Sequence, residues 1–215
     1  MITDQKGFTL IELLIAMAMS VIILGAARTM YTIQAHTIKS QEYQMEAQEY
    51  ARVSLDMMAR EIRNLGYFPK VTSCASPANT KGIVSASAAS ISFVYDADGN
   101  GNCTGTGESV TYTYDSTTKN ISRTADGSTQ TLTNGNVTAF ELRYYPRQTS
   151  GTAPAPYCSS GGSPSGCSGT LSANLASVQR VYISLTVKLQ RTDTRVGGQN
   201  DVAMNSSVDL RNRVN

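Results

Sequence analysis

Oxygen-bearing side chains alternate with small residues in the segment DADGNGN, at positions 96–102. They belong to Asp96, Asp98, Asn100 and Asn102. The glycines between them permit the sharp turn that lets such oxygens converge on a calcium ion. An EF-hand also needs a glutamate at the twelfth loop position, but Gly107 stands there and Glu108 follows one residue later. The segment therefore indicates either a polar hairpin tip, which is the simpler interpretation, or a weak calcium site.

The four cysteines all lie beyond residue 70, in sequence rich in Gly, Ser and Thr, and none forms a C-x-x-C pair. This pattern disfavours a metal cage and favours disulfides formed outside the cytoplasm. Four cysteines permit three sets of pairs. Proximity along the chain favours Cys158 with Cys167 and Cys74 with Cys103, and free thiols are the alternative.

Little in the sequence is suited to catalysis. The one histidine, His36, lies in helix-forming sequence, and the G-x-S-x-G form of a nucleophile elbow is absent. The 18 basic and 16 acidic residues are spread along the chain, so no basic stripe indicates nucleic acid. We therefore expect a protein that is not an enzyme, requires no cofactor and has no nucleic-acid partner.

Glu12 is the only charged residue in the segment 8–27, FTLIELLIAMAMSVIILGAA. As a helix, these twenty residues would span about 30 Å, the thickness of a bilayer core. A carboxylate inside that layer costs about 2.5–3.5 kcal/mol and usually has a partner, which the adjacent Ile11 and Leu13 do not offer. A place in the first helical turn, near the interface, would make the charge tolerable but would not explain its presence.

The sequence after the span predicts that the same helix continues to about residue 65. Residues 28–65 contain neither Gly nor Pro, Gly66 would end the helix, and Pro69 would prevent its resumption. Apolar positions recur at steps of three and four: Tyr43, Ala47, Tyr50, Ala51, Leu55, Met58, Ile62 and Leu65. The opposite face is charged and is interpreted as largely solvated: Glu46, Glu49, Arg52, Asp56, Arg60 and Arg63.

Beyond Pro69, alternation of apolar and polar residues predicts strands. The clearest is VYISLTVKL at 181–189, and weaker patterns occur at 90–95, 108–114, 120–124, 137–145 and 202–210. Turn pairs such as Asp126-Gly127 and Asn134-Gly135 favour an antiparallel meander. The segment 146–169 is rich in Pro, Gly and Ser and predicts a surface loop. The expected fold is α+β, with a long N-terminal helix packed on an antiparallel sheet with long loops.

The segment KGFTLIE at 6–12 resembles the prepilin signature of type IV pilins and type II secretion pseudopilins. The resemblance implies that a prepilin peptidase cuts between Gly7 and Phe8 and methylates the new amine of Phe8. That amine would be a partner for Glu12, in its own chain or in an adjacent subunit of a filament. The type IV pilin fold implied by the resemblance agrees with the α+β expectation.

Two further segments resemble the minor pilins of the PilW family and, more loosely, the minor pseudopilin GspJ. They are LDMMAREIRNLGY at 55–67 and VDLRNRVN at 208–215. An ordinary secretory signal peptide is disfavoured, because the apolar run is too long and contains an acid. The expected organisation is a leader at 1–7, a transmembrane or filament-core segment at 8–27, an amphipathic segment at 28–66 and a globular antiparallel β domain at 67–215.

The resemblance implies a minor pilin that helps to initiate or cap a type IV pilus. Its expected partners are other minor pilins, the major pilin, the prepilin peptidase, the inner-membrane assembly platform and, before assembly, membrane lipid. It would be a single-pass inner-membrane protein with an extracytoplasmic β domain, and later part of an extracellular pilus. A minor pseudopilin of type II secretion is the first alternative, and a membrane-anchored adhesin or ion-binding module is the second.

Overall fold

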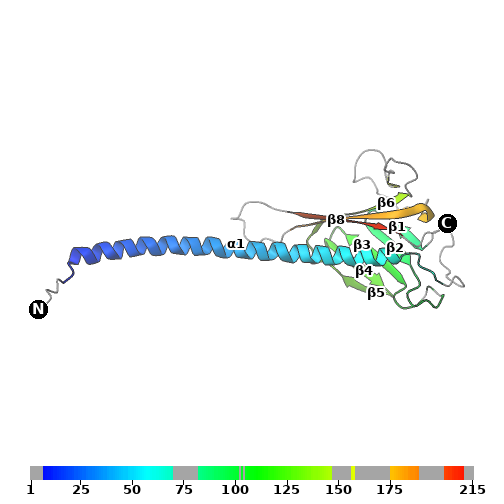
Figure 1. The fold of residues 1–215 in the computed structure, drawn as a ribbon, viewed down its shortest axis with the longest axis horizontal. Helices are drawn as coiled ribbons and strands as arrows, with labels where there is room; N and C mark the ends of the chain where they lie inside the picture. Colours follow the sequence, from blue (N-terminus) through cyan, green and yellow to red (C-terminus); the bar gives the residue numbers. More distant parts are fainter. Residues whose placement is uncertain are drawn as a thin grey trace, which may run out of the picture. The chain divides into compact units, whose positions relative to one another are not determined.

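The computed structural model describes residues 7–69, 82–101, 103, 105–146, 156–157, 175–188 and 201–210. The chain divides into two compact units, with a boundary in the long helix between Gln44 and Met45. The helix and the strands are labelled in Figure 1.

Helix α1 runs over Leu10–Asn64 without interruption, as the absence of proline predicts. In the first unit, all residues from 7 to 34 are exposed. The helix is long and apolar enough to cross a membrane, and no residue of its most apolar stretch is buried. The predicted continuous helix is therefore confirmed within one or two residues at each end.

In the second unit, one face of α1 is buried against the strands. Its buried residues are Ala47, Ala51, Ser54, Leu55, Met58, Ala59 and Ile62, followed by Leu65 just beyond the helix. The predicted apolar stripe is thus confirmed from Ala47 onward. Tyr43 and Tyr50 are exceptions, because they remain 40% and 43% exposed.

The helix ends at a close approach between two glycines. Gly66 has a φ of 71°, a left-handed conformation that favours glycine, and its N–H donates to the carbonyl oxygen of Val94. Gly82 has a φ of 95°, and the N–H of Val94 donates to its carbonyl oxygen. A Cβ atom at Gly82 would lie 2.6 Å from the backbone N and Cα of Gly66. Glycine at position 82 is therefore what lets the helix end and the first strand meet.

Five strands form one antiparallel meander in the order β1-β2-β3-β4-β5. They are β1 Ile83–Ala86, β2 Ser90–Val94, β3 Ser109–Asp115, β4 Asn120–Ala125 and β5 Ser128–Thr131. The β4–β5 turn has positive φ at both Asp126 and Gly127, the two central residues of a type I′ hairpin. The turn pair at 126–127 was therefore predicted correctly.

A second antiparallel sheet has the order β6-β7-β8. Its strands are β6 Val137–Pro146, β7 Val178–Val187, which follows the short 3₁₀ helix Leu175–Ser177, and β8 Val202–Asp209. Val181, Ile183, Leu185 and Val187 are buried, as the alternation in β7 predicts. The structure thus divides the predicted strands between two sheets and adds two that were not predicted, β1 and β5. These two are short, and all four residues of β5, STQT, are polar and exposed.

A partly buried ion pair joins the helix to the first sheet. Glu61 of α1 accepts hydrogen bonds from Arg123 of β4, at 2.8 Å from Nη2 and 3.0 Å from Nε, and from the hydroxyl of Tyr112 of β3 at 2.6 Å. The Glu61 and Arg123 side chains are each 18% exposed. Because the guanidinium fork and the phenol together satisfy the carboxylate, this contact fixes the rotation of α1 on the sheet. The predicted division of the chain at residues 7, 27 and 66 stays a prediction.

Candidate functional site

The start of α1 contains the residues of the predicted processing and assembly site. Thr9 precedes the helix, and Glu12 lies in its first turn. The backbone N–H and the hydroxyl of Thr9 both donate to Oε2 of Glu12, at 3.0 and 2.9 Å, and the N–H of Glu12 donates to Oγ1 of Thr9 at 3.4 Å. This reciprocal arrangement is a capping box, in which residues three apart satisfy N–H groups that the first helical turn leaves unpaired.

Glu12 therefore has a local partner before any processing. Oε2 receives both donors from Thr9, while Oε1 receives no hydrogen bond from the part of the chain that the structure describes. The adjacent Ile11 and Leu13 offer Glu12 no partner, but Thr9, one helical turn earlier, does. The signal was readable, because T-x-x-E before an apolar run is the usual signature of a capping box.

Gly7 and Phe8 lie just before the helix. A Cβ atom at Gly7 would meet no atom within 4 Å among the described residues, and Phe8 is 89% exposed. The described fold therefore does not require glycine at position 7 or bury the phenylalanine that follows. Cleavage between Gly7 and Phe8 stays a prediction, as does N-methylation of Phe8.

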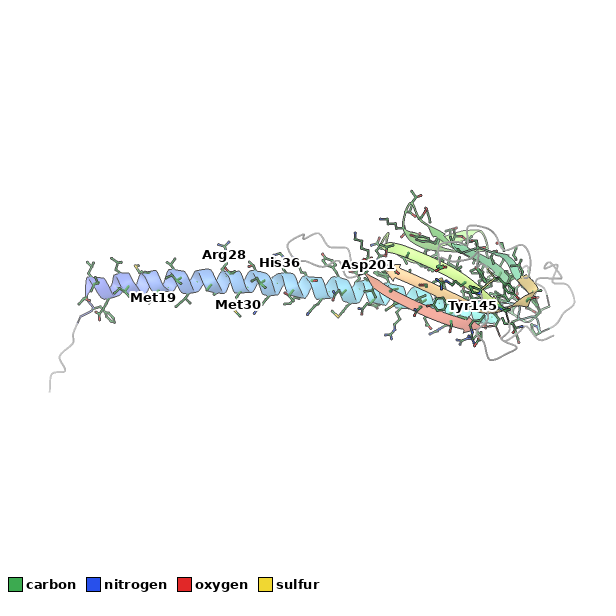
Figure 2. All side chains as sticks on the ribbon, turned by 90° about the horizontal axis from the view of Figure 1, so that it is seen from above. Met19, Arg28, Met30, His36, Tyr145 and Asp201 are labelled. Atoms are coloured by element: carbon green, nitrogen blue, oxygen red, sulfur yellow. The ribbon has the colours of Figure 1, made fainter. Side chains whose placement is uncertain are left out.

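The apolar part of α1 presents large side chains on all sides. In Figure 2, Met19, Arg28 and Met30 project from the helix, and the two methionines are 58% and 65% exposed. Gly25 likewise has no atom within 4 Å of a built Cβ. In water, such a surface would be strongly unfavourable, so it needs lipid or other apolar helices around it.

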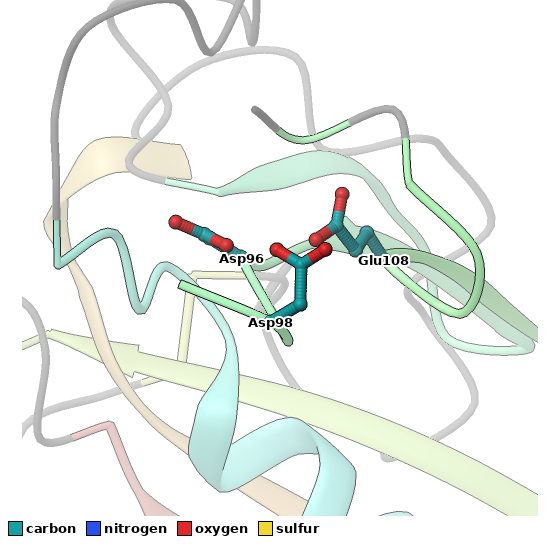
Figure 3. A group of neighbouring side chains, drawn as sticks. All are labelled: Asp96, Asp98 and Glu108. Carbon is teal, nitrogen blue, oxygen red and sulfur yellow. The ribbon is translucent and has the colours of Figure 1, made fainter. Parts of the chain in front are cut away.

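A second candidate site lies in the loop between β2 and β3. Figure 3 shows Asp96, Asp98 and Glu108 together, and one carboxylate oxygen of each lies within 4.8 Å of the others. Asp96 and Glu108 are buried, whereas Asp98 is exposed. Glu108 was discounted in the sequence analysis because it falls one position late for an EF-hand. That test does not apply here, because Glu108 directly precedes a strand that pairs with β2.

Backbone N–H groups surround the two buried carboxylates. Asp96 accepts from Gly99 at 2.7 Å and from Gly101 at 2.9 Å, while Glu108 accepts from Ala97 at 3.2 Å and from Gly105 at 2.5 Å. These donors compensate part of the cost of burying negative charge and order the loop without a cation. Each carboxylate oxygen of Asp96 and Glu108 retains a lone pair. The geometry is therefore compatible both with a polar hairpin tip and with a weak calcium site.

The remaining predicted ligands are less well placed. Asn100 is exposed, and its amide donates to Asp98 at 2.7 Å, while Asn102 lies outside the described residues. Weak calcium binding at Asp96, Asp98, Asn100 and Asn102 therefore stays a prediction.

Of the four cysteines, only Cys103 is described. It is buried and takes part in a disulfide. Cys74, Cys158 and Cys167 lie outside the described residues. The pairs Cys74 with Cys103 and Cys158 with Cys167 stay predictions.

Comparisons with known proteins agree with the prepilin resemblance. Residues 2–27 match the prokaryotic N-terminal methylation motif, and residues 40–209 match the family of prepilin peptidase-dependent protein B. No curated protein and no solved structure matches the chain significantly. The methylation motif and the apolar helix fit a membrane-anchored protein with a folded C-terminal domain.

The first match contains the Gly7-Phe8 bond and the capping box, and it implies processing by prepilin peptidase and assembly with pilus components. The second match covers more than half of the chain, including all the described strands. The protein is thus a type IV prepilin-like protein that belongs to the prepilin peptidase-dependent protein B family.

Proposed function

We propose that this protein is a minor pilin that helps to initiate or cap a type IV pilus. Prepilin peptidase would cut between Gly7 and Phe8 and methylate the amine of Phe8. The protein would wait in the inner membrane and then join other minor pilins and the major pilin at the assembly platform. The resemblance of residues 55–67 and 208–215 to PilW supports a minor role, with GspJ as the looser parallel.

One observation carries the proposal: Glu12 is oriented by Thr9 so that one of its carboxylate oxygens remains available. Cleavage would release a positive amine at Phe8, one residue before the cap. In a low-dielectric environment, an amine and a carboxylate attract strongly, and each offsets the other's desolvation. The pair would form within one chain in the membrane or between adjacent subunits in a fibre.

The exposed apolar surface of α1 supports the same function. Before assembly, the surface from Leu10 to Leu24 would contact lipid. In a fibre, neighbouring helices would bury it against one another, so that the membrane anchor becomes the fibre core. Families of this prepilin-like type are structural proteins, which supports a role without catalysis.

The test is Glu12→Ala in the full chain. We expect membrane insertion to be unchanged, because removing a charge from an apolar span favours insertion. Incorporation should be lost, as measured by immunolabelling of sheared filaments together with mass spectrometry of the N-terminus. Normal incorporation of the variant would overturn the assigned role of Glu12.

Matched control variants separate the effect of the Glu12 charge from the effect of its hydrogen bonds to Thr9. Ser20→Ala removes another polar group of the span, whose hydroxyl only donates to the carbonyl of Met17, and should assemble normally. Glu12→Gln keeps an oxygen that can accept from Thr9 but removes the charge. It should fail in assembly as Glu12→Ala does, because the amine needs an anion.

Two alternatives remain testable. A minor pseudopilin of type II secretion would share all of this chemistry, and its presence in a secretion pseudopilus rather than in pili would identify it. A membrane-anchored adhesin or ion-binding module would use the β strands for its activity and α1 only as an anchor. An N-methylated Phe8 at the mature terminus would contradict that second alternative.

A further inference from the structure

The two sheets have four edge strands, and three of them are protected against pairing with another chain. Strands β1 and β5 have only four residues each, and the pairing of β1 with β2 contains a register shift. At β6, the N–H of Leu142 donates to the carbonyl oxygen of Ala88 at 2.8 Å, and the carbonyl oxygen of Tyr144 accepts from the N–H of Tyr157 at 2.8 Å. Short length, irregular pairing and covering segments are usual means by which an edge strand avoids a further strand.

The fourth edge strand, β8, has none of these protections among the described residues. It has eight residues, Val202–Asp209, and pairs with β7 without a register shift. It contains no proline, lysine or arginine, and its only charged residue, Asp209, is the last. The edge of β8 is therefore regular and uncharged over residues 202–208, about 23 Å at 3.3 Å per residue.

The backbone groups that β8 directs away from β7 follow from the pairing of the two strands. The N–H of Leu210 donates to the carbonyl oxygen of Gln179 at 2.8 Å. Because bonded positions alternate in an antiparallel ladder, the even-numbered residues of β8 bond to β7, and the odd-numbered residues direct their N–H and C=O groups away from it. The odd-numbered residues are Ala203, Asn205, Ser207 and Asp209, which are all exposed, and no described residue bonds to their backbone groups. These groups are suited to bind one further strand.

The side chains of β8 indicate which strand would fit. Val208 is buried, while Val202 and Met204 are half-buried, and Met204 packs against the core. Apolar residues at alternate positions of an added strand would cover Val202 and Met204. The side chains on the other face, from Ala203 to Ser207, are small or polar. The added strand would therefore alternate between apolar and polar residues.

Acidic residues lie at both ends of β8. Asp201, which is labelled in Figure 2, precedes the strand, and Asp209 ends it and pairs with Arg180 at 2.6 Å. In the antiparallel registers that overlap most of the strand, a second copy of β8 would set its Asp209 opposite or diagonal to Asp201, at both ends of the pair. Like charges in those positions are unfavourable. A strand with lysine or arginine at its ends would meet opposite charge instead.

We propose that the free edge of β8 binds an extended segment of a partner protein, in which apolar residues alternate with polar ones and basic residues stand at the ends. Main-chain hydrogen bonds would supply the affinity, and the side chains would select the partner and its register. The inference concerns the β domain alone and goes beyond the function proposed above, on which it does not depend.

The experiment uses the full chain in non-ionic detergent micelles and a fluorescent synthetic peptide, Lys-Val-Thr-Val-Thr-Val-Thr-Val-Lys. We expect the peptide to bind, as measured by fluorescence anisotropy. Asn205→Pro removes an outward N–H and places a ring where the added strand would lie, so it should weaken binding about tenfold or more. The melting temperature should change little, because proline is tolerated at outward positions of edge strands. Asn205→Ala changes the side chain alone and should bind the peptide as the wild type does.

A second measurement changes the peptide and leaves the protein as it is. In an antiparallel arrangement with valines toward the core, the threonines direct their N–H groups at β8, whereas in a parallel arrangement the valines do. N-methylation of either all threonines or all valines should therefore weaken binding about tenfold or more, and the other modification should not. A peptide with glutamate in place of both lysines should bind about two- to fivefold more weakly.

Each of these measurements has a result that would overturn the proposal. No binding at millimolar peptide, equal binding to Asn205→Pro, or the same response to both N-methylated peptides would exclude β8 as the binding edge. Equal binding of the glutamate peptide would exclude the basic ends. A wild-type dimer in sedimentation that Asn205→Pro abolishes would assign the edge to a second copy instead. Pilus incorporation enters none of these results, so the proposed function is tested separately by Glu12→Ala.

Discussion

At two sites, hydrogen bonds from nearby groups fix the position of an acidic side chain. At the start of α1, Thr9 orients Glu12, and in the β2–β3 loop, backbone N–H groups surround Asp96 and Glu108. The Thr9–Glu12 arrangement can be predicted from the T-x-x-E pattern. The position of Glu108 cannot, because its carboxylate lies close to the backbone of Gly105, where a Cβ atom would lie 2.8 Å from Oε2 of Glu108.

Asp96→Asn should destabilise the folded domain. Asp96 is fully buried, and each of its carboxylate oxygens accepts a hydrogen bond from a backbone N–H group. In the variant, an amide nitrogen that cannot accept replaces one of these oxygens, so one N–H group loses its partner. We expect a loss of about 1–3 kcal/mol in the free energy of unfolding, measured by denaturant titration. Asp98→Asn, at an exposed position, should cost clearly less. Equal losses would contradict the account of the loop.

The calcium prediction is tested on the same proteins. It requires that millimolar calcium raise the melting temperature of the wild type and that Asp98→Asn reduce this rise. A melting temperature that does not respond to calcium would leave the carboxylates as acceptors for backbone N–H groups only.

At the level of elements, the buried tyrosines of the first sheet make the free energy of unfolding vary with pH in the alkaline range. Burial raises the pKa of Tyr112, and its hydrogen bond to Glu61 raises that pKa further; burial also raises the pKa of Tyr95 and Tyr114. In the unfolded chain these phenols lose their protons near pH 10, whereas in the folded chain they keep them to higher pH. Folding is thus favoured below pH 10, and this contribution is lost as pH rises toward the folded pKa.

We therefore expect the melting temperature to fall between pH 9.5 and pH 11.5. Tyr112→Phe should make this fall shallower, although it also removes the hydroxyl that donates to Glu61. Melting followed by circular dichroism across that range provides the measurement, with Tyr67→Phe, at a half-exposed position, as the control. An unchanged pH slope in Tyr112→Phe would contradict the assignment.

Within α1, Gly25 weakens an exposed helix, and no described residue lies within 4 Å of a Cβ built there. Substitution of Gly25 by alanine should therefore stabilise the helix by about 0.5–1 kcal/mol. Amide exchange in detergent micelles should slow about two- to fivefold around position 25. Ser20→Ala offers a comparison at a position that already has a side chain. Faster exchange in Gly25→Ala would contradict the prediction.

At the scale of the whole molecule, the sequence predicted features that depend on local patterns. The helix, its end at Gly66, the type I′ turn and six of the strands follow from periodicity, glycine and proline. The division into two sheets, the Glu61–Arg123 pair and the approach of Gly82 to Gly66 join positions far apart in sequence. No local pattern specifies such contacts, so they could not be predicted.

Gly82→Ala tests the most demanding of these long-range contacts. A side chain there would have to displace the backbone of Gly66 and adopt a φ of 95°, which is strained for alanine. We expect a loss of about 2–4 kcal/mol in the free energy of unfolding. Gly107→Ala, with a φ of 81° but open space around it, isolates the cost of φ alone. Similar losses in the two variants would mean that the close approach contributes nothing.

The junction between Gly66, Val94 and Gly82 also has a mechanical consequence. A pull along α1 is passed to the first sheet by the Glu61–Arg123 ion pair and by the hydrogen bonds of Val94 with both glycines. The hydrogen bonds of Val94 lie beside the start of β1 and the end of β2, whereas the ion pair reaches β4. In a fibre under tension, this joint would carry load together with the buried face of the helix, and its close contact depends on two residues that lack side chains.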